Sequence, residues 1–457
     1  LKLAQCLYAV GCAAARMASA IGSARSVAVA ASHGLAGLSW DSVAAASSTW
    51  NAARQPRPGD VPLVLYRDAN AWCPFCHRVF FFMEQKRLRY ATERVHLGGD
   101  PREPPKQKSY LRDVAPRGNV PALRIRDEIV LESLDILRVL DREFPDEHAA
   151  AKTPEDAALE EQMVRSSGAF DTDCDEWLHN TDAHEESALR SQALQKLQWL
   201  EEALGARPAG PFFLGERVTL ADAAFVGFLT RLHTNYAYFK ALDVREPSAG
   251  YPRLAAWLAA IDATPGGAAT KQDAFYEQRV YQAHPSRRAA AEPCMSLHPK
   301  RLCIGEPSHY SPPPPPVSDM LAAGGEAALE AAWRLCDRRR VLVSFLLRKR
   351  REAGVPPPQQ HWKSVSRRAP ELQPPASEAP VDLDRVDRHL LALASVLAGV
   401  CTPAEGVAYA GGVAAFCGGE VAGLGDLVGT PRDMTAAAAS ELRAAVRDML
   451  SAPNDGT

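Results

Sequence analysis

From residue 63 on, the spacing of the hydrophobic residues fits strands in some segments and helices in others. A short apolar run at 63–66 predicts a strand, and after Cys73 the apolar residues recur on one face of a helix that Pro74 can open. A second strand is expected at 90–95. The sequence "NVPALRIRDEIVLESLDILRVLDREF" then predicts strand, tight turn, strand and a helix opened by Ser133. The order is β-α-β, loop, β-β-α, which indicates an α/β domain.

From about residue 153 to 279 the apolar positions keep the period of helices throughout. The clearest runs are "LQKLQWLEEAL" and "TLADAAFVGFLTRL", and Thr219 with Asp222 forms a capping-box sequence at the start of the second. We assign this box to folding and not to chemistry. This part is predicted to be a separate all-helical bundle.

A proline-rich stretch, "EPSHYSPPPPPVSD" at 306–319, cannot continue a helix. It predicts a semi-rigid linker, with recognition by an SH3-type domain as the alternative. A long helix is expected at about 325–351, followed by a second polar spacer. Apolar residues then recur at intervals of three and four between 383 and 397, and the run at 436–450 behaves similarly. The C-terminal part is therefore predicted to be a helical extension.

These patterns predict an α/β plus all-α fold class with five parts. They are a transit peptide or disordered segment at 1–60, an α/β domain at 61–148, an all-helical domain at 152–285, a proline-rich linker at 286–319 and a helical extension at 320–457.

The overall charge gives little information on partners. Among 457 residues, 52 lysines and arginines nearly balance 55 acidic residues, and the net charge of −3 gives no global argument for nucleic acid or an anionic membrane. Ten cysteines at irregular spacings are too sparse for a disulfide-stapled secreted scaffold. A reducing compartment is expected.

The first 60 residues are rich in alanine and serine and have no acidic residue before Asp41. This composition is typical of an organelle transit peptide, with an alanine-rich disordered tail as the alternative. The plastid stroma is the expected location, and the mitochondrion or cytoplasm are the alternatives. Arg16 and Arg25 interrupt the longest apolar runs well before the length of a membrane span, so no transmembrane segment is expected.

The stretch "AWCPFCHRVF", at 71–80, places two cysteines around a proline and a phenylalanine. A structural zinc site normally needs a second pair of ligands, and the other cysteines are isolated in the sequence, so we expect no metal. A buried structural pair is another interpretation, because free cysteine is often a small core residue. The third interpretation is thiol chemistry.

The predicted position of Cys73 gives thiol chemistry a mechanism. At the start of a helix, its sulfur would lie beside unsatisfied N–H groups and the positive end of the helix dipole, which favour thiolate over thiol. His77 and Arg78 would add positive potential. Cys73 is therefore the expected nucleophile, and Cys76, one turn further, is the candidate resolving thiol.

Two later motifs predict a site for a peptide. In "GNVPAL", a cis Val120–Pro121 bond would explain a proline at the start of a strand, and it would expose the Val120 backbone to an extended peptide. In "LESLDI", Ser133 and local amides can hold a carboxylate, while Glu132 can pair with an ammonium group. Glutathione carries the thiol, carboxylate and amine that would satisfy all three motifs.

With these motifs, residues from about 63 to 279 resemble the glutathione transferase family. "WCPFCHRV", "GNVPAL" and "LESLDIL" are similar to its thioredoxin-like glutathione site, and "GPFFLGERVTLADAAF" to the signature of its all-helical domain. A cysteine at the active position makes the chain most similar to the omega, lambda and dehydroascorbate reductase classes. The far C-terminal "GTPRDMTAAAASELRAAV" resembles long plant and algal members with a helical extension.

The resemblance implies roles for individual residues. Cys73 would be the catalytic thiolate, Val120 the backbone clamp with Pro121 cis, and Glu132 with Ser133 the holders of the γ-glutamyl group. The remaining glutathione contacts implied are Phe75 and a lysine before the cis-proline loop, which Lys108 or Lys106 can supply, and of these we assign Lys108.

The resemblance also implies the reaction, which is thiol exchange through a mixed disulfide between Cys73 and glutathione. Its substrates would be a small electrophile, a disulfide or a glutathionylated molecule, and a homodimer is the family expectation. One alternative is a conjugating transferase that activates glutathione itself. Another is a non-catalytic binding or assembly protein whose extension contacts a partner through "RRRVLVSFLLRKRR" at 338–351, although those arginines can equally be solvated.

An acceptor pocket is expected between the α/β and all-helical domains. Phe170, Trp177 and Tyr236 are its aromatic candidates, with core packing as the alternative for each. His96, His233 and Trp257 are expected to have packing or surface roles.

Overall fold

The computed structural model divides into two compact units, and each is described by itself. The first covers Arg54–Tyr310 with Gln360–Pro370, and the second covers Leu1–Ala53, Ser311–Gln359 and Glu371–Thr457. The described residues are 38–52, 55–69, 71, 73–96, 106–145, 153–180, 182–207, 210–272, 325–352, 380–412, 415–416 and 434–452. Residues 1–37 of the expected transit segment and the proline-rich stretch 306–319 lie outside them.

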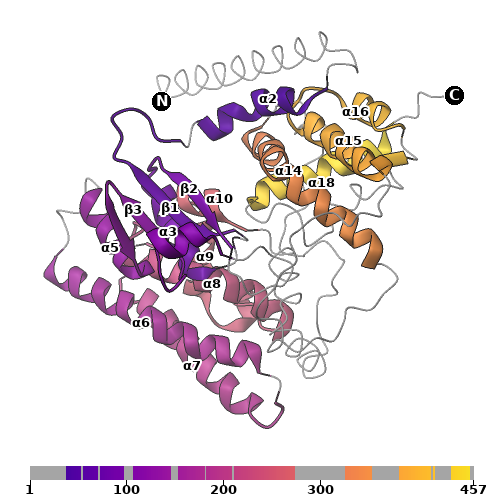
Figure 1. Cartoon of the computed structure of the whole chain (residues 1–457). Helices are drawn as coiled ribbons and strands as arrows, with labels where there is room; N and C mark the ends of the chain where they lie inside the picture. The colour runs from indigo at the N-terminus through magenta and orange to yellow at the C-terminus, as the bar shows by residue number, and fades with distance from the viewer. Residues whose placement is uncertain are drawn as a thin grey trace, which may run out of the picture. The chain divides into compact units, whose positions relative to one another are not determined.

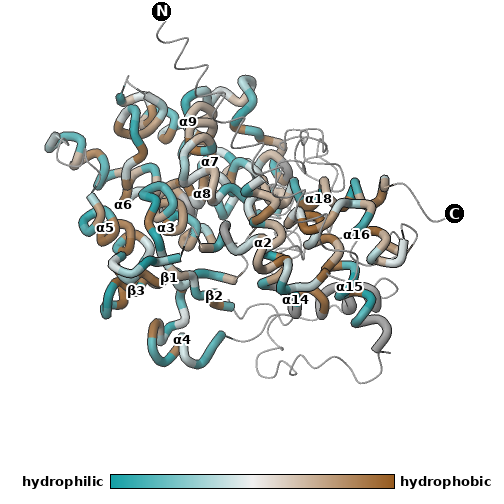
Figure 2. Tube along the Cα trace, turned by 90° about the horizontal axis from the view of Figure 1, so that it is seen from above, coloured by the Kyte–Doolittle hydropathy of each residue, from teal (hydrophilic) through white to brown (hydrophobic). Residues whose placement is uncertain are grey.

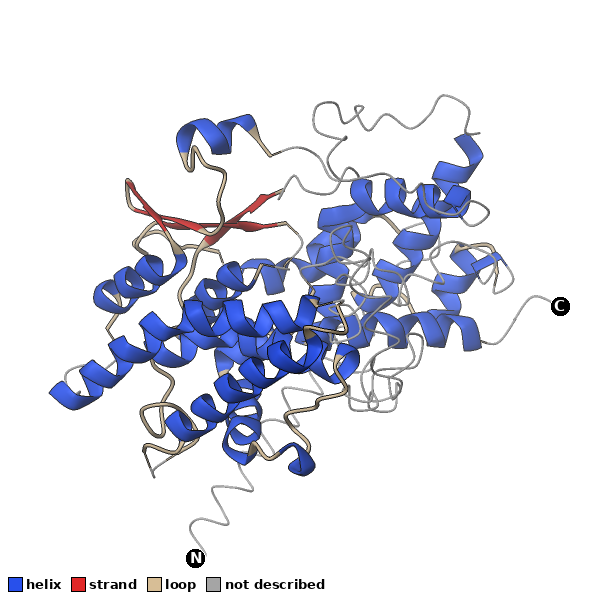
Figure 3. Ribbon diagram, turned by 90° about the horizontal axis from the view of Figure 1, so that it is seen from below, coloured by secondary structure: helices blue, strands red, loops and turns tan. Residues whose placement is uncertain are grey.

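The first unit contains a four-stranded sheet with the order β2-β1-β3-β4. Its strands are β1 Leu63–Asp68, β2 Ala91–Val95, β3 Ala122–Ile125 and β4 Glu128–Leu131. Figure 1 labels β1, β2 and β3, and Figure 3 draws the strands in red. β1 and β2 are parallel, because α3 (Pro74–Gln85) connects them, whereas β3 pairs antiparallel with both β1 and β4. This order confirms the predicted β-α-β and β-β-α units and the thioredoxin-like fold.

The two faces of the sheet follow the alternation along β1. Leu63 and Leu65 belong to the large core that includes α3 and α5 (Ser133–Glu143). Tyr66 belongs to a smaller cluster on the opposite face, with Tyr110 of α4 (Lys108–Asp113). Because successive side chains of a strand point to opposite faces, one face of β1 packs on α3 and α5 and the other on α4.

The helices that follow belong to the same unit. They are α6 Pro154–His179, α7 Glu186–Leu204, α8 Leu220–Phe239, the short 3-10 helix η3 Pro247–Ala249, α9 Pro252–Ala263 and α10 Pro265–Thr270. α8 packs against α3, α5 and α6, so that one buried core runs from Leu63 of β1 to Ile261 of α9. The α/β part and the helical part therefore fold around a common core.

The predicted capping box at the start of α8 is confirmed. Asp222 accepts hydrogen bonds from the backbone and hydroxyl of Thr219, at 2.8 and 2.9 Å. It also accepts from the indole N–H of Trp257, at 2.8 Å, and Trp257 is fully buried. The packing role expected for Trp257 is thus confirmed.

The second unit is helical within the described residues. It contains α2 Trp40–Ala52, α14 Glu326–Glu352, α15 Pro380–Leu397, α16 Pro403–Tyr409 and α18 Ala436–Ser451. Hydrophobic and hydrophilic residues alternate along these helices in Figure 2, as expected of amphipathic helices that bury one face. The helices predicted at 325–351, 383–397 and 436–450 are therefore present.

Helix α2 lies inside the segment expected to be a transit peptide or disordered, and there the structure differs from the expectation. Val43 is fully buried in the core of the second unit, and the indole N–H of Trp40 donates to Asp387 of α15 at 3.3 Å. Arg339 of α14 donates to the same carboxylate at 2.5 and 2.6 Å. These contacts join the three helices across 347 residues for Trp40 and Asp387 and 48 for Arg339 and Asp387, so they have no local signal.

No helix in the part of the chain that the structure describes combines the length and the apolar character that a membrane span requires.

Candidate active site

Cys73 occupies the N-cap of α3, as the sequence predicts. Its backbone is extended, with φ −68° and ψ 120°, and Pro74 follows at the first helical position. The sulfur of Cys73 accepts a hydrogen bond from the amide of Cys76 at 3.4 Å. The helix start therefore provides a backbone donor to the sulfur, and the Cys73 side chain is 8 % exposed.

Cys76 lies in a different environment. It is buried, and its sulfur accepts a hydrogen bond from the amide of Asp68 at 3.4 Å. Burial, with a further contribution from the neighbouring Cys73, raises the pKa of the Cys76 thiol well above its ordinary value. Cys76 is therefore a protonated thiol at neutral pH, which weakens its candidacy as a resolving nucleophile.

Asp68, the last residue of β1, was not predicted from the sequence as part of the site. Its carboxylate is fully buried and accepts a hydrogen bond from the amide of Cys73 at 3.2 Å. The signal that could have found it is an acidic residue that ends a buried strand just before the loop leading to Cys73, called here the thiol loop. Asp68 thus links the end of the strand to the backbone of Cys73 and to the sulfur of Cys76.

His77 corrects an expectation, because it supplies no positive charge. Burial, and next the nearby Arg231, lower the pKa of the His77 imidazole well below its usual value. Its ring nitrogens contact Thr270 at 3.1 Å and Arg231 at 2.7 Å. His77 is therefore a neutral residue within the contact between α3 and the helical part.

The cis Val120–Pro121 bond is present, as predicted. The hydroxyl of Tyr110 donates to the carbonyl oxygen of Asn119 at 2.5 Å, and the ring of Tyr110 packs on Tyr66, with centroids 5.7 Å apart. Burial raises the pKa of Tyr110, so its hydroxyl remains a donor. Tyr110 thus holds Asn119, the residue before Val120, and this role was not predicted from the sequence.

Glu132 and Ser133 meet at the start of α5. Glu132 has φ 62°, in the left-handed region that non-glycine residues rarely adopt, and Ser133 is the first helical residue. Arg78 of α3 is buried and donates to the Ser133 hydroxyl at 3.5 Å. Its guanidinium also lies over the rings of Phe75 and Phe228, 5.3 and 4.6 Å from their centroids. Arg78 thus places positive charge behind the predicted carboxylate site.

A cavity of about 590 Å³ brings most of the predicted binding residues together. Its lining is Phe75, Lys106, 115–121 and 131–133. This set includes Val120, Pro121, Glu132 and Ser133. Lys106 lines the cavity, whereas Lys108 is an exposed residue at the start of α4 and Cys73 is outside the lining. The geometry thus favours Lys106 over Lys108.

The aromatic candidates for an acceptor pocket have core positions. Phe170, Trp177 and Tyr236 are buried in the common core. Trp177 and Tyr236 form an edge-to-face pair with centroids 4.7 Å apart, and the Tyr236 hydroxyl donates to the carbonyl of Cys174 at 2.7 Å. Core packing, the alternative, is the better account of all three. Among the described residues, no three His, Cys, Asp or Glu side chains gather as a metal site would need.

Two family models match this unit. The "Glutathione S-transferase, N-terminal domain" matches residues 72–143, and the "Glutathione S-transferase, C-terminal domain" matches residues 156–260. Together they include both cysteines of the motif, the cavity and α8.

Several curated plant proteins are similar to the same region. Glutathione S-transferase L3 of Arabidopsis thaliana is 31% identical over 206 residues, which is 44% of this chain and 79% of the relative. Glutathione S-transferase DHAR2 of the same plant is 28% identical over 174 residues, 38% of this chain and 73% of the relative. "Glutathione S-transferase L2, chloroplastic", also from Arabidopsis thaliana, is 25% identical over 201 residues, 44% of this chain and 64% of the relative.

Proposed function

Because this chain belongs to the glutathione S-transferase family, we propose that it is a glutathione-dependent thiol transferase or reductase in which Cys73 carries glutathione as a mixed disulfide. The observation that carries the proposal is the sulfur of Cys73 at the N-cap of α3, 3.4 Å from the amide of Cys76. A sulfur with a backbone donor at a helix N-terminus suits a thiolate that attacks and later leaves.

The reaction has two exchange steps. The Cys73 thiolate attacks the glutathione sulfur of a glutathionylated substrate, forms the Cys73–glutathione disulfide and releases the substrate thiolate, which takes a proton from water. A second glutathione, as its thiolate, then attacks the glutathione sulfur of the mixed disulfide. This step regenerates the Cys73 thiolate and forms glutathione disulfide, so the net reaction consumes one reduced glutathione and exchanges the substrate's disulfide for glutathione disulfide.

The cavity residues would hold the peptide. The Val120 backbone would pair with the extended glutathione chain, and Glu132 would bind its ammonium group. Ser133 would hold the γ-glutamyl carboxylate, with the Arg78 guanidinium behind it. Lys106 is the lysine that lines this cavity, and Phe75 would cover the bound chain.

We also propose that the protein acts in a plastid. The support is the basic, alanine- and serine-rich composition before Leu38, together with the chloroplastic relative. Because α2 belongs to the core of the second unit, a transit peptide would end before Trp40.

The test compares two reactions in purified full-length protein. Reduction of a glutathionylated peptide should exceed conjugation of glutathione to a chlorinated aromatic acceptor, and Cys73→Ser should lose at least 100-fold of the reduction. Cys336→Ser, which changes a cysteine of the second unit, should retain wild-type activity. If conjugation is the faster reaction and survives in Cys73→Ser, the protein is instead a conjugating transferase.

A further inference from the structure

Arg231 of α8 reaches from the helical part to the loop that precedes Cys73. One nitrogen, Nη1, donates to the Gly227 carbonyl and contacts Nδ1 of His77, both at 2.7 Å. The other, Nη2, donates to the Ala71 carbonyl and to Oε1 of Gln272, both at 3.2 Å. A single guanidinium therefore joins α8, the segment after α10, the first turn of α3 and the thiol loop.

The hydrogen bonds around His77 fix its tautomer. The Thr270 hydroxyl donates to the Gly266 carbonyl at 2.8 Å, so its oxygen accepts from His77 Nε2, 3.1 Å away. Nδ1 then carries no proton and accepts from Arg231. A neutral His77 is thus a fixed acceptor for Arg231 and makes the position of the guanidinium specific.

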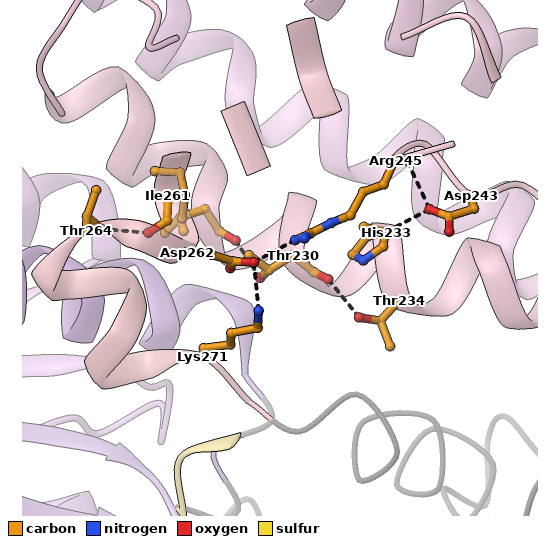
Figure 4. Close-up of polar contacts among 10 residues, drawn as sticks. Thr230, His233, Thr234, Asp243, Arg245, Ile261, Asp262, Thr264 and Lys271 are labelled. Atoms are coloured by element: carbon orange, nitrogen blue, oxygen red, sulfur yellow. Dashed lines mark hydrogen bonds and ion pairs between the residues drawn. The ribbon is translucent and has the colours of Figure 1, made fainter. Parts of the chain in front are cut away.

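Ala71 needs such support because its φ is 51°, in the left-handed region. Its carbonyl accepts from Arg231 and also from the side-chain amide of Gln272. Next to Gln272, Lys271 binds Asp262 at 2.7 Å, and Arg245 binds the same carboxylate at 2.9 Å (Figure 4). The segment that carries Gln272 is therefore itself anchored to α9.

The same turns of α8 pack directly on the catalytic turn. A Cβ atom at Gly227 would lie 2.1 Å from the carbonyl oxygen of Pro74, so only glycine allows this approach. Phe228 packs edge-to-face on Phe75, with centroids 5.2 Å apart. α8 is thus the surface on which the Cys73 turn rests, and Arg231 holds the loop that leads into it.

We propose that Arg231 is a positioning residue for Cys73, which holds the Ala71 carbonyl and the neutral His77 so that the Cys73 sulfur stays at the N-cap of α3. This inference rests on the proposed function for its effect on turnover. Without the guanidinium, the strained Ala71 backbone relaxes and the sulfur loses its alignment with the Cys76 amide.

The test measures how fast iodoacetamide alkylates Cys73 at neutral pH, located by peptide mass spectrometry, in the full-length protein. Arg231→Met should lower this rate and kcat at least tenfold, while KM for glutathione stays within twofold, because the cavity residues are unchanged. Arg231→Lys should recover little of the rate, since an ammonium cannot reproduce the fork. Arg207→Met, which removes an ion pair with Asp156, is the matched control and should keep the wild-type rate.

An unchanged or faster alkylation of Cys73 in folded Arg231→Met would overturn the proposal, as would full recovery by Arg231→Lys, which would assign the effect to charge alone. If Arg231→Met does not fold, Gln272→Met decides, because it removes the second donor to Ala71. A threefold slower alkylation is expected there, and a wild-type rate overturns the proposal. Alkylation of Cys73 requires no glutathione, so it tests the positioning role separately from the proposed function. If Cys73 is alkylated slowly in Arg231→Met while Cys73→Ser keeps its turnover, the proposed function is refuted and the positioning role is retained.

Discussion

The sulfur of Cys73 accepts a hydrogen bond from the amide of Cys76, whereas the sulfur of Cys76 accepts one from Asp68, at the end of the neighbouring strand. The two thiols of one short motif are thus held by different parts of the backbone. Only Cys73 lies at the helix N-terminus, and the pKa of Cys76 is raised well above its ordinary value, chiefly by burial.

The first prediction concerns Cys76→Ser. Its kcat should stay within about threefold of wild type, because a thiol with a raised pKa forms thiolate only at high pH and takes no part in turnover at neutral pH. Steady-state reduction of a glutathionylated peptide between pH 6 and 9 measures this. Accumulation of a Cys73–glutathione adduct in the variant, with loss of turnover, would show that Cys76 normally resolves it.

The second prediction concerns the cis-proline loop. Tyr110→Phe removes the hydrogen bond to the Asn119 carbonyl, worth roughly 1 kcal/mol net, and should raise KM for glutathione about fivefold. The Cys73 alkylation rate should not change, because α3 is untouched. Tyr90→Phe, which removes a hydroxyl contact with Glu84 away from the cavity, is the matched control. An unchanged KM in Tyr110→Phe would mean that the cis bond and its strand hold the loop without it.

The third prediction follows from Asp222. Burial raises the pKa of this carboxyl to about 6 in the folded protein, against an ordinary value of 3.8. The folded state therefore binds the proton more tightly, and the contribution of Asp222 to the free energy of unfolding falls as pH rises from about 4 to 6, by roughly 3 kcal/mol. As pH rises across this range, the Tm of wild type should fall relative to the Tm of Asp222→Asn. A flat difference, or one that moves the other way, would contradict it.

The fourth prediction concerns the second unit. Asp387→Asn removes the charge that Arg339 and the Trp40 indole share, and it should destabilise this unit by about 1 kcal/mol, since the pair is partly exposed. Amide hydrogen exchange in α2 and α15 should become faster, while glutathione kinetics stay at wild type. Asp384→Asn, an exposed change on the same helix, is the control. Equal exchange in the two variants would show that packing alone holds α2.

The parts of the fold that were predictable from sequence have local causes. The N-cap position of Cys73 follows from a strand, a short loop and Pro74, and the cis Val120–Pro121 bond follows from a proline where a strand begins. The capping box of Thr219 and Asp222 likewise depends only on residues within one stretch of four.

Several of the contacts that were not predicted join distant segments. Arg231 meets Ala71 across 160 residues, and Trp40 meets Asp387 across 347, so no local pattern identifies either pair. His77 adjoins the motif, but its neutrality depends on Arg231 and on burial, neither of which is visible in "CPFCHRV". Tertiary environment, and not residue type, decided the chemistry at these positions.

The most direct test of the central claim is intact and peptide mass spectrometry of the full-length protein after treatment with glutathione disulfide, with Cys73→Ser beside the wild type. A single glutathione adduct on Cys73, removed by reduced glutathione and absent from the variant, is the predicted result. A wild-type protein that forms no adduct at Cys73, or an adduct that persists in Cys73→Ser, would contradict Cys73 as the carrier of glutathione.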